Sequence, residues 1–277
     1  MTPNALHFTT TRFEAGASAI TDAFGRAGAE GRSALITYLT VGWPNPAATH
    51  DLVMALQEGG ADIIELGVPF SDPVADGPAI QRATHAALQA GTTPRACLEA
   101  VARLRAAGLT APLLLMGYAN PIISYGLREW VHDCAEAGVD GLIVPDLPPE
   151  EALPLRAACD KRGLALVFLV APTTPPARVA RIAAETRGFL YLVSRLGTTG
   201  AALTVDDGIR RQLEAARQHA RTPVAVGFGI AQPEQVRALA PLADGIIVGS
   251  AVVEKAVEGV AALRGYIASL RAATHIG

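Results

Sequence analysis

The chain has 277 residues, 50% hydrophobic and 18% charged, which is enough for one large core and short for two ordinary domains joined by a linker. Its net charge of -3 excludes the basic excess typical of nucleic-acid-binding proteins, so we expect small-molecule or protein partners. No apolar run approaches the roughly 20 residues that cross a bilayer, and the first residues lack a signal-peptide pattern. We expect a cytoplasmic protein with one domain over residues 1–277 and no nucleic-acid or membrane partner.

From residue 34 onward, short apolar runs alternate with longer Ala-rich segments that carry charges. Each run is continuously apolar, which is typical of a strand in a parallel sheet covered on both faces. The predicted strands lie at 34–42, 62–68, 112–118, 140–146, 164–172, 189–194, 223–229 and 244–250. Helices are predicted between them at 50–60, 94–108, 128–138 and 233–243, and several are followed by the glycine common at helix ends.

A weak internal repeat supports the same arrangement. The segments EGGADIIELG, EAGVDGLIVPD and APLADGIIVGS each run from a helix end through an aspartate into a strand. Eight strand–helix units in about 250 residues predict a TIM (β/α)8 barrel, with an additional N-terminal helix over residues 17–31 closing its bottom. The alternative is an open doubly wound sheet, but no GxGxxG follows the first predicted strand.

The cysteines and histidines show no metal-binding pattern. Cys97, Cys134 and Cys159 lie far apart, and none belongs to a CxxC or a Cys/His ligand spacing. We interpret them as reduced packing residues, and we expect neither a metal nor an organic cofactor.

In such a barrel the active site lies at the carboxyl ends of the strands and in the loops that follow them. Glu65 stands inside the apolar run DIIELGV, and the loop after that run, PFSDPVADGP, contains Asp76. A buried, isolated carboxylate is costly, so such a group is usually functional or paired. Tyr118 lies at the end of the third run and Tyr191 within the sixth, and both belong to one predicted polar rim.

Glycine-lined loops after the last strands predict a phosphate site. Gly229 lies in GFGI, Gly249 and Ser250 lie in VGSA, and Gly200 lies in RLGTTG. Their backbone N–H groups are unobstructed by side chains, and a helix N-terminus adds a favourable dipole for an anion. A single glycine loop would be read as a tight turn, but three loops on adjacent strands favour phosphate binding.

These segments resemble the tryptophan synthase alpha subunit family. IELGVPFSDPVADGP matches the family's signature segment, and the matches YLTVGWPNP, MGYANPI, VPDLPPEE, YLVSRLGTTG, GFGI and VGSA follow in the family's order over about residues 20–270. The resemblance implies a lyase that cleaves indole-3-glycerol phosphate to indole and glyceraldehyde 3-phosphate by a retro-aldol reaction. It also implies docking on a pyridoxal-phosphate beta subunit, in an alpha2beta2 heterotetramer through which indole passes to the partner.

The resemblance also assigns roles by position. The catalytic positions are Glu65, Asp76 and Tyr191; the phosphate site is Gly200, Gly229, Gly249 and Ser250; the indole pocket is Tyr38, Met116 and Tyr118; the closing loop contains Arg195 and Thr199; and the partner interface contains Asp72, Pro73 and Asn120. The chain departs from the family pattern at Thr198, which precedes Thr199 where valine is common, and at Tyr38, where phenylalanine is frequent.

The chemistry accounts for two carboxylates with different roles. Breaking the bond at indole C3 needs a proton delivered to C3 and another removed from the side-chain hydroxyl. Glu65, at the mouth of an apolar barrel, can do both, because desolvation raises its pKa toward the working pH. An ionised Asp76 that accepts a hydrogen bond from the ring N–H would stabilise the positive charge on the protonated ring.

Other interpretations remain for several residues and for the function. Asp72 is also compatible with forming a turn instead of contacting a partner subunit, Tyr191 with packing in the core, and Arg195 with ordering its loop. The functional alternatives are a stand-alone lyase that releases indole, a weakly catalytic regulatory subunit, or another sugar-phosphate barrel such as an epimerase. The intact Glu65 and Asp76 argue against the regulatory subunit, and the whole segment around them argues against the epimerase.

Overall fold

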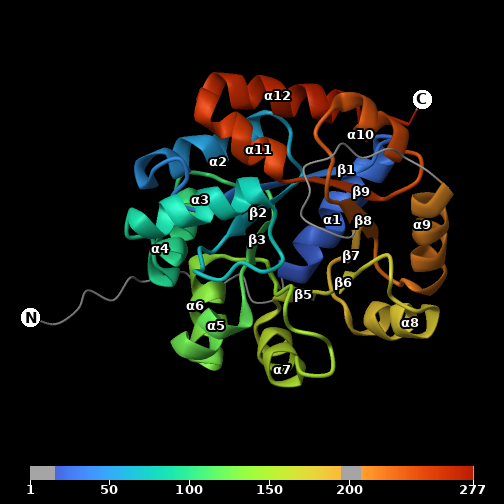
Figure 1. Ribbon diagram of the computed structural model, residues 1–277, viewed down its shortest axis with the longest axis horizontal. Coiled ribbons are helices and arrows are strands. Elements are labelled where there is room, and N and C mark those ends of the chain that lie inside the picture. Colours follow the sequence, from blue (N-terminus) through green and yellow to red (C-terminus); the bar gives the residue numbers. More distant parts are fainter. Residues whose placement is uncertain (1–15, 195–206, 277) are drawn as a thin grey trace, which may run out of the picture.

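The computed structural model describes residues 16–194 and 207–276, and its strands form one parallel sheet wrapped into a barrel (Figure 1). The strand order is β5-β4-β3-β2-β1-β9-β8-β7-β6, and β5 and β6 are consecutive pieces of one chain segment, so the sheet returns on itself. The strands are β1 (Ala34–Thr40), β2 (Ile63–Gly67), β3 (Leu113–Met116), β4 (Gly141–Ile143), β5 (Ala165–Val167), β6 (Leu169–Val170), β7 (Leu190–Val193), β8 (Val224–Gly227) and β9 (Gly245–Val248).

Helices surround the barrel and connect successive strands, except β5 and β6, which follow each other directly (Figure 1). They are α1 (Gly16–Ala29), α2 (Thr49–Glu58), α3 (Pro78–Gln89), α4 (Pro94–Ala106), α5 (Ala119–Tyr125), α6 (Leu127–Ala137), α7 (Leu153–Arg162), α8 (Pro176–Glu185), α9 (Asp207–His219), α10 (Pro233–Leu239), α11 (Ser250–Lys255) and α12 (Val260–Ala272), with 3-10 turns η1 (Pro46–Ala48) and η2 (Ala256–Glu258). The predicted TIM barrel is confirmed. Within the described ranges, no helix is long and apolar enough to span a membrane.

The strand predicted over residues 164–172 is in fact two strands, because the segment changes its partner at Phe168. β5 pairs with β4, whereas β6 pairs with β7. The Phe168 N–H donates to Thr186 Oγ1 (3.0 Å), and the Thr186 hydroxyl donates to the Phe189 carbonyl (2.9 Å). A side chain here takes the place of a regular ladder bond, and a local interruption of this kind bends a strand.

Two hydrophobic clusters explain why the strands are apolar on both faces. Ile36 and Leu114 point into the barrel and pack with Phe189, whereas Leu35 and Leu115 belong to the cluster between the barrel and its helices. All seven residues of β1 are buried. The continuous apolar runs of the sequence therefore follow from a sheet that has a core on each side.

Helix α1 closes the amino-terminal end of the barrel, as the sequence predicts. The Ala17 N–H donates to the Gly163 carbonyl (3.1 Å), and the Phe24 ring lies 5.7 Å from the ring of Phe189. Gly245 begins β9 at this end, where a Cβ would lie 2.7 Å from the Phe24 ring. The glycine thus permits the close approach of helix and strand.

The internal repeat of the sequence forms a set of structural ion pairs at the same end. Each repeated aspartate accepts a backbone N–H from the start of a neighbouring strand and pairs with an arginine. The sets are Asp62 with Leu35 N–H (2.8 Å) and Arg32, Asp140 with Leu113 N–H (2.8 Å) and Arg105, and Asp244 with Val224 N–H (2.8 Å) and Arg217.

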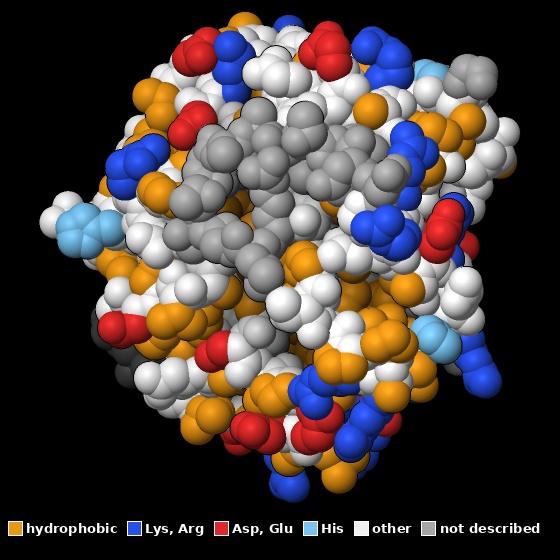
Figure 2. Space-filling model, turned by 45° about the vertical axis from the view of Figure 1, so that its right-hand side comes forward, with side chains coloured by type: hydrophobic (Ala, Val, Ile, Leu, Met, Phe, Trp, Pro, Cys, Tyr) orange, Lys and Arg blue, Asp and Glu red, His pale blue; other side chains and the backbone are white. Residues whose placement is uncertain are grey.

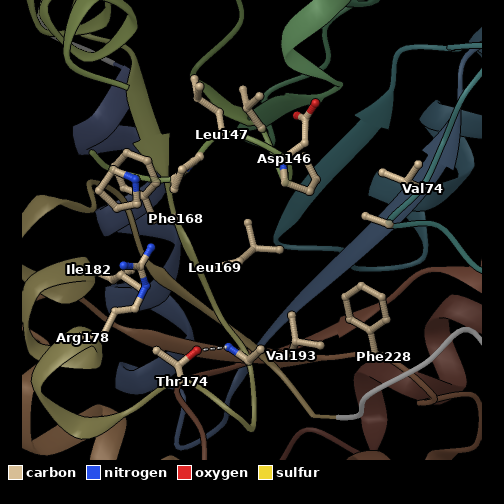
Figure 3. Close-up of a pocket in the computed structure, with 16 residues that line it drawn as sticks. Val74, Asp146, Leu147, Phe168, Leu169, Thr174, Arg178, Ile182, Val193 and Phe228 are labelled. Atoms are coloured by element: carbon tan, nitrogen blue, oxygen red, sulfur yellow. Dashed lines mark hydrogen bonds between the residues drawn. The ribbon is translucent and has the colours of Figure 1, made fainter. Parts of the chain in front are cut away.

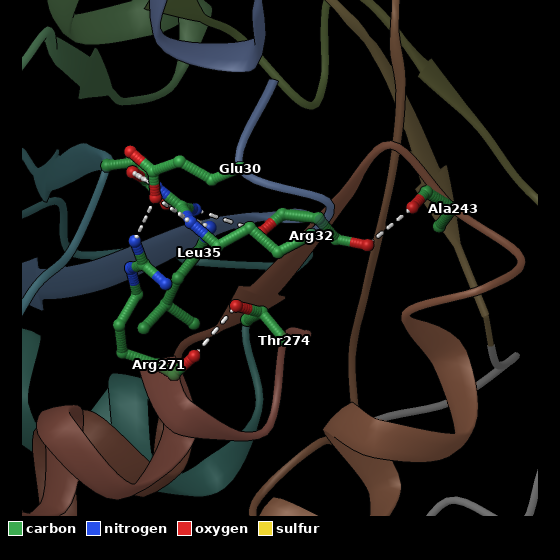
Figure 4. A network of polar contacts seen from close by, with 8 residues as sticks. Glu30, Arg32, Leu35, Ala243, Arg271 and Thr274 are labelled. Carbon is green, nitrogen blue, oxygen red and sulfur yellow. Dashed lines mark hydrogen bonds and ion pairs between the residues drawn. The ribbon is translucent and has the colours of Figure 1, made fainter. Parts of the chain in front are cut away.

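The first of these sets is part of a larger network (Figure 4). Arg32 donates to both oxygens of Asp62 (2.6 and 2.8 Å) and to Glu30 (2.7 Å), and Glu30 also accepts from Arg271 in α12 (2.7 Å). Arg32 is buried, so its charge is compensated on two sides. The network ties the first strands to the last helix.

We predict that Asp140→Ala destabilises the barrel by about 3 kcal/mol, because the change leaves a half-buried Arg105 charge and the Leu113 N–H without this acceptor. Urea denaturation followed by circular dichroism measures the loss. Asp51→Ala is the control, since Asp51 is exposed and pairs only with the neighbouring His50 in the described part of the chain. Equal unfolding midpoints for the two variants would contradict the structural role of the repeat.

Candidate active site

Glu65 projects into the barrel from the middle of β2. It lies beside Tyr38 of β1 and Leu114 of β3 in the strand register, and only 1% of its surface is exposed. Its Oε1 atom is buried, and no described residue forms a hydrogen bond with it. Burial raises the pKa of the Glu65 carboxyl to about 8. Glu65 is therefore protonated at neutral pH and has a proton to give.

Space for this arrangement comes from a glycine on the same strand. A Cβ at Gly67 would lie 1.9 Å from the Tyr38 hydroxyl, so no other residue fits without moving that ring. The Tyr38 hydroxyl is also within hydrogen-bonding distance of Thr40 Oγ1 (3.2 Å). Tyr38 is fully buried beside Glu65 and forms part of the wall around it.

Asp76 lies in the loop between β2 and α3. A turn closed by the bond from its N–H to the Pro73 carbonyl (3.1 Å) brings the side chain inward, and Gly77 and Pro78 then begin α3. Only 6% of Asp76 is exposed, and its Oδ2 accepts a hydrogen bond from the Tyr118 hydroxyl (2.9 Å). Burial raises the pKa of Asp76 to about 6, while the Tyr118 bond opposes the rise. Asp76 is mostly ionised at neutral pH.

Tyr191 of β7 approaches the same space from the opposite wall. Its ring packs edge-on against Phe228 (6.1 Å between centroids), and a Cβ at Gly227 would lie 2.7 Å from its hydroxyl. Burial raises the pKa of Tyr191 well above its usual value, and the charges of Glu65 and Asp76 raise it further. The three residues predicted as catalytic therefore share one electrostatic environment, in which the phenol stays protonated.

An open cavity of about 450 Å³ lies at the carboxyl ends of β4, β6, β7 and β8 (Figure 3), and Glu65, Asp76 and Tyr191 are not among the residues that line it. Val74 and Ala75 bring the Asp76 loop to its edge, and Phe228 connects it to Tyr191. Figure 2 shows hydrophobic side chains gathered around a hollow on one face of the molecule. The largest apolar side chains of the cavity are Val144, Leu147, Phe168, Leu169, Ile182, Val193 and Phe228.

The sequence reasoning missed these cavity residues. The residues predicted for the indole pocket, Tyr38, Met116 and Tyr118, do not line the open cavity and are almost fully buried. Phe228 and Leu169 could have been found as large apolar residues at the carboxyl ends of predicted strands. Their neighbours were indistinguishable from core residues, because burial in a strand and exposure at a barrel mouth have the same local pattern.

The described part of the predicted phosphate site lies on two neighbouring strand ends. Gly229 follows β8 with a positive φ of 76°, and Gly249 separates β9 from α11, which begins at Ser250. Gly229 and Ser250 are exposed. Gly200, Arg195 and Thr199 lie outside the described residues, as does Thr198.

The residues predicted at a partner interface lie on the surface next to the Asp76 loop. Asp72 and Asn120 are exposed and Pro73 is partly exposed. Asp72 also forms a turn, because its carbonyl accepts the Val74 N–H (2.9 Å) and its carboxylate accepts the Ser71 hydroxyl (2.5 Å). A turn-forming role for Asp72 is therefore present in the structure, and it leaves the side chain on the surface.

The cysteines and other possible ligands form no metal centre within residues 16–194 and 207–276. Cys97, Cys134 and Cys159 are free and buried. Burial raises the pKa of the Cys97 and Cys159 thiols to about 12, so they stay protonated. They pack in the outer hydrophobic cluster, as the sequence predicts.

The fold is a TIM barrel in which two buried carboxyl groups and a buried tyrosine lie near a largely apolar cavity at the carboxyl ends of the strands. A model of one family, described as tryptophan synthase alpha chain, matches residues 24–274. This chain belongs to the tryptophan synthase alpha chain family, and it is a lyase.

Individual relatives agree with this assignment. The tryptophan synthase alpha chain of Chloroflexus aggregans is 50% identical over 236 residues, which cover 85% of this chain and 88% of that one. That of Geobacter sp. is 46% identical over 259 residues, with 92% and 97% covered. Among solved structures, Mycobacterium tuberculosis tryptophan synthase has a TM-score of 0.88 at 40% identity, covering 93% of this chain and 98% of that chain. The Legionella pneumophila alpha subunit has a TM-score of 0.85 at 35% identity, with 92% and 98% covered.

Proposed function

We propose that Glu65, Asp76 and Tyr191 carry out in this chain the lyase reaction of its family, the cleavage of indole-3-glycerol phosphate to indole and glyceraldehyde 3-phosphate. The observation that carries the proposal is the state of Glu65: a carboxyl group inside an apolar barrel, protonated at neutral pH, with an oxygen free of described partners. A second carboxyl group in the adjoining loop is ionised at the same pH. One group can give a proton while the other stabilises positive charge.

In the first step the Glu65 carboxyl delivers its proton to C3 of the indole ring. The ring then carries a positive charge that extends to its N–H. The Glu65 carboxylate next removes the proton of the side-chain hydroxyl, whose oxygen forms the carbonyl of glyceraldehyde 3-phosphate. The bond from C3 breaks, and its electron pair returns to the ring and cancels the positive charge. Glu65 ends the cycle protonated, so one mobile carboxyl serves as both acid and base.

Asp76 and Tyr191 supply electrostatic stabilisation around this step. An ionised Asp76 accepts a hydrogen bond from the ring N–H, and that bond strengthens as the ring becomes positive. The protonated phenol of Tyr191 faces both carboxyl groups and can donate to a substrate hydroxyl. Buried charges act strongly here because water is excluded from the barrel interior.

The surroundings of these groups suit the two ends of the substrate. The apolar cavity beside Tyr191 and the Asp76 loop accepts a flat aromatic ring. Backbone N–H groups near Gly229 and Gly249 can hold the phosphate at the ends of β8 and β9. Binding at both ends orients the bond to be broken between the two carboxyl groups.

We predict that Glu65→Gln lowers kcat by about 10³-fold or more, because the amide keeps the shape of the side chain but has no acidic proton to transfer. Release of indole from indole-3-glycerol phosphate measures the rate, and calorimetric titration with the same compound should show that binding persists. Glu99→Gln, on the exposed face of α4, is the matched control and should keep full activity. An unaffected rate in Glu65→Gln would exclude the proposed mechanism.

The pH dependence of kcat/KM should be bell-shaped, with limbs near pH 6 and pH 8. Asp76 must be ionised, so activity falls as the pH drops below its pKa of about 6. Glu65 must be protonated for the first step, so activity falls as the pH rises above its pKa of about 8. Initial rates of indole release from pH 5 to pH 10 test both limbs. Activity that keeps rising from pH 8 to pH 10 would contradict the acid role of Glu65.

We also propose that the chain works with a pyridoxal-phosphate beta subunit, as part of an alpha2beta2 assembly that receives the indole. Two large apolar side chains support a partner on this rim: Val74 is 77% exposed in the Asp76 loop, and Ile123 is 65% exposed on α5. They lie on the elements that carry Asp72, Pro73 and Asn120. A surface with exposed apolar residues beside an active site is suited to a partner.

Adding a purified beta subunit should raise the rate of indole-3-glycerol phosphate cleavage, and the two chains should co-elute in gel filtration. Ile123→Asp should weaken both effects, because it places a charge in the proposed contact. Leu153→Asp is the matched control, since Leu153 is 59% exposed on α7, outside the proposed contact. No rate change and no co-elution would favour the stand-alone lyase.

A further inference from the structure

Tyr118 makes contacts that differ from those of a simple pocket wall. It follows β3 and immediately precedes α5, and its ring packs on Phe70, with 5.5 Å between the centroids. The side chain is buried and does not line the open cavity. Its hydroxyl instead reaches the loop that carries Asp76.

The two hydrogen bonds of this hydroxyl fix its direction. The Ala75 N–H donates to the phenol oxygen (3.0 Å), so that oxygen is the acceptor of this bond. The phenol O–H then donates to Asp76 Oδ2 (2.9 Å), which suits an ionised carboxylate. One hydroxyl therefore binds two consecutive residues of the loop, the first through its backbone and the second through its side chain.

We propose that Tyr118 is a positioning residue for the lyase reaction, which holds the Asp76 carboxylate through Oδ2 and leaves Oδ1 for the ring N–H of the substrate. No residue within the described ranges donates to Oδ1. The inference rests on the proposed role of Asp76. It gives Tyr118 a task apart from lining the indole pocket, and it explains how a loop residue keeps a defined direction before substrate binds.

Other titratable groups around Asp76 do not replace this contact. Glu65 of β2, Tyr38 of β1 and Tyr191 of β7 interact with Asp76 or with one another through their charges. Asp146, after β4, binds the Ala119 N–H (3.0 Å). Burial, and then the charge of Asp76, raise the pKa of the Tyr118 phenol, and Asp146 adds only a smaller contribution. The phenol therefore stays protonated and remains a donor, and its bond favours the ionised form of Asp76.

The test is Tyr118→Phe, which keeps the ring on Phe70 and removes both hydrogen bonds. We expect kcat to fall about tenfold to a hundredfold, as for the loss of a hydrogen bond to a charged group. The acidic limb of the pH profile should move to higher pH, because Asp76 loses a bond that favours its ionised form. Tyr125→Phe is the matched control: its phenol also donates to an aspartate, Asp133 (2.6 Å), and its loss should change neither.

A merely structural role would lower the melting temperature without moving the acidic limb, and that result would overturn the inference. In an Asp76→Asn background, Tyr118→Phe should lose most of its effect, since the two residues act together. If Tyr118→Phe lowers kcat as much in the Asp76→Asn background as in the unchanged protein, the inference is also overturned. If Asp76→Asn alone leaves the rate of indole release unchanged, the proposed function itself fails. If Asp76→Asn abolishes that rate but Tyr118→Phe leaves it unchanged, only the present inference is rejected.

A second variant tests the same bond without removing it. Site-specific replacement of Tyr118 by 3-fluorotyrosine makes the phenol a stronger donor while keeping its shape. We expect the acidic limb to move to lower pH, opposite to Tyr118→Phe. The measurement remains decisive if Tyr118→Phe fails to fold, and an unmoved limb would contradict the proposal.

Discussion

The proposed chemistry of this molecule depends on one free-energy cost, the removal of the Glu65 carboxyl group from water. Parallel strands with a core on both faces enclose it so fully that its charged form is disfavoured and its pKa rises to about 8. A carboxyl group that keeps its proton at neutral pH is an acid. Around it, Gly67 makes room for the Tyr38 ring, and Tyr191 closes the opposite wall. The packing of the barrel thus sets the protonation state that the proposed mechanism requires.

Carboxyl groups at the amino ends of the strands are paired with arginines, whereas Glu65, farther along β2, is paired with none in the described part of the chain. Asp62 and Glu65 are three residues apart on one chain segment, yet Asp62 is bound by both Nη atoms of Arg32, whereas Glu65 has no such partner among the described residues. The paired aspartates at the amino ends of the strands compensate buried charge and connect neighbouring strands. Inside the barrel, the burial of Glu65 raises its pKa instead, which is the property that the proposed function uses. The stability of the barrel and its chemistry are therefore separated along the length of each strand.

Asp76 shows an intermediate case. It lies on a loop and is buried, but a single phenol bond limits the rise of its pKa to about 6. Tyr118, between β3 and α5, thereby helps to set the charge of Asp76, which lies in the loop between β2 and α3. Two carboxyl groups with pKa values on either side of neutrality give one acid and one anion at the same pH. The difference arises because no described residue donates a hydrogen bond to the buried Glu65 Oε1, whereas Asp76 accepts one from the Tyr118 phenol.

The sequence by itself determined the barrel, the helix over residues 17–31, the position of Glu65 inside a strand and that of Asp76 in the loop after it, because apolar runs and their flanking residues are local patterns. It determined the family through one long contiguous segment. Only the tertiary structure decided that the strand over 164–172 breaks at Phe168, where Thr186 takes over a backbone bond. It also decided that Tyr118 binds Asp76, 42 residues away in the chain, and that the open cavity is lined by Phe228 and Leu169. Contacts of this kind depend on which strands become neighbours in the folded barrel, and the local sequence pattern does not show which strands those are.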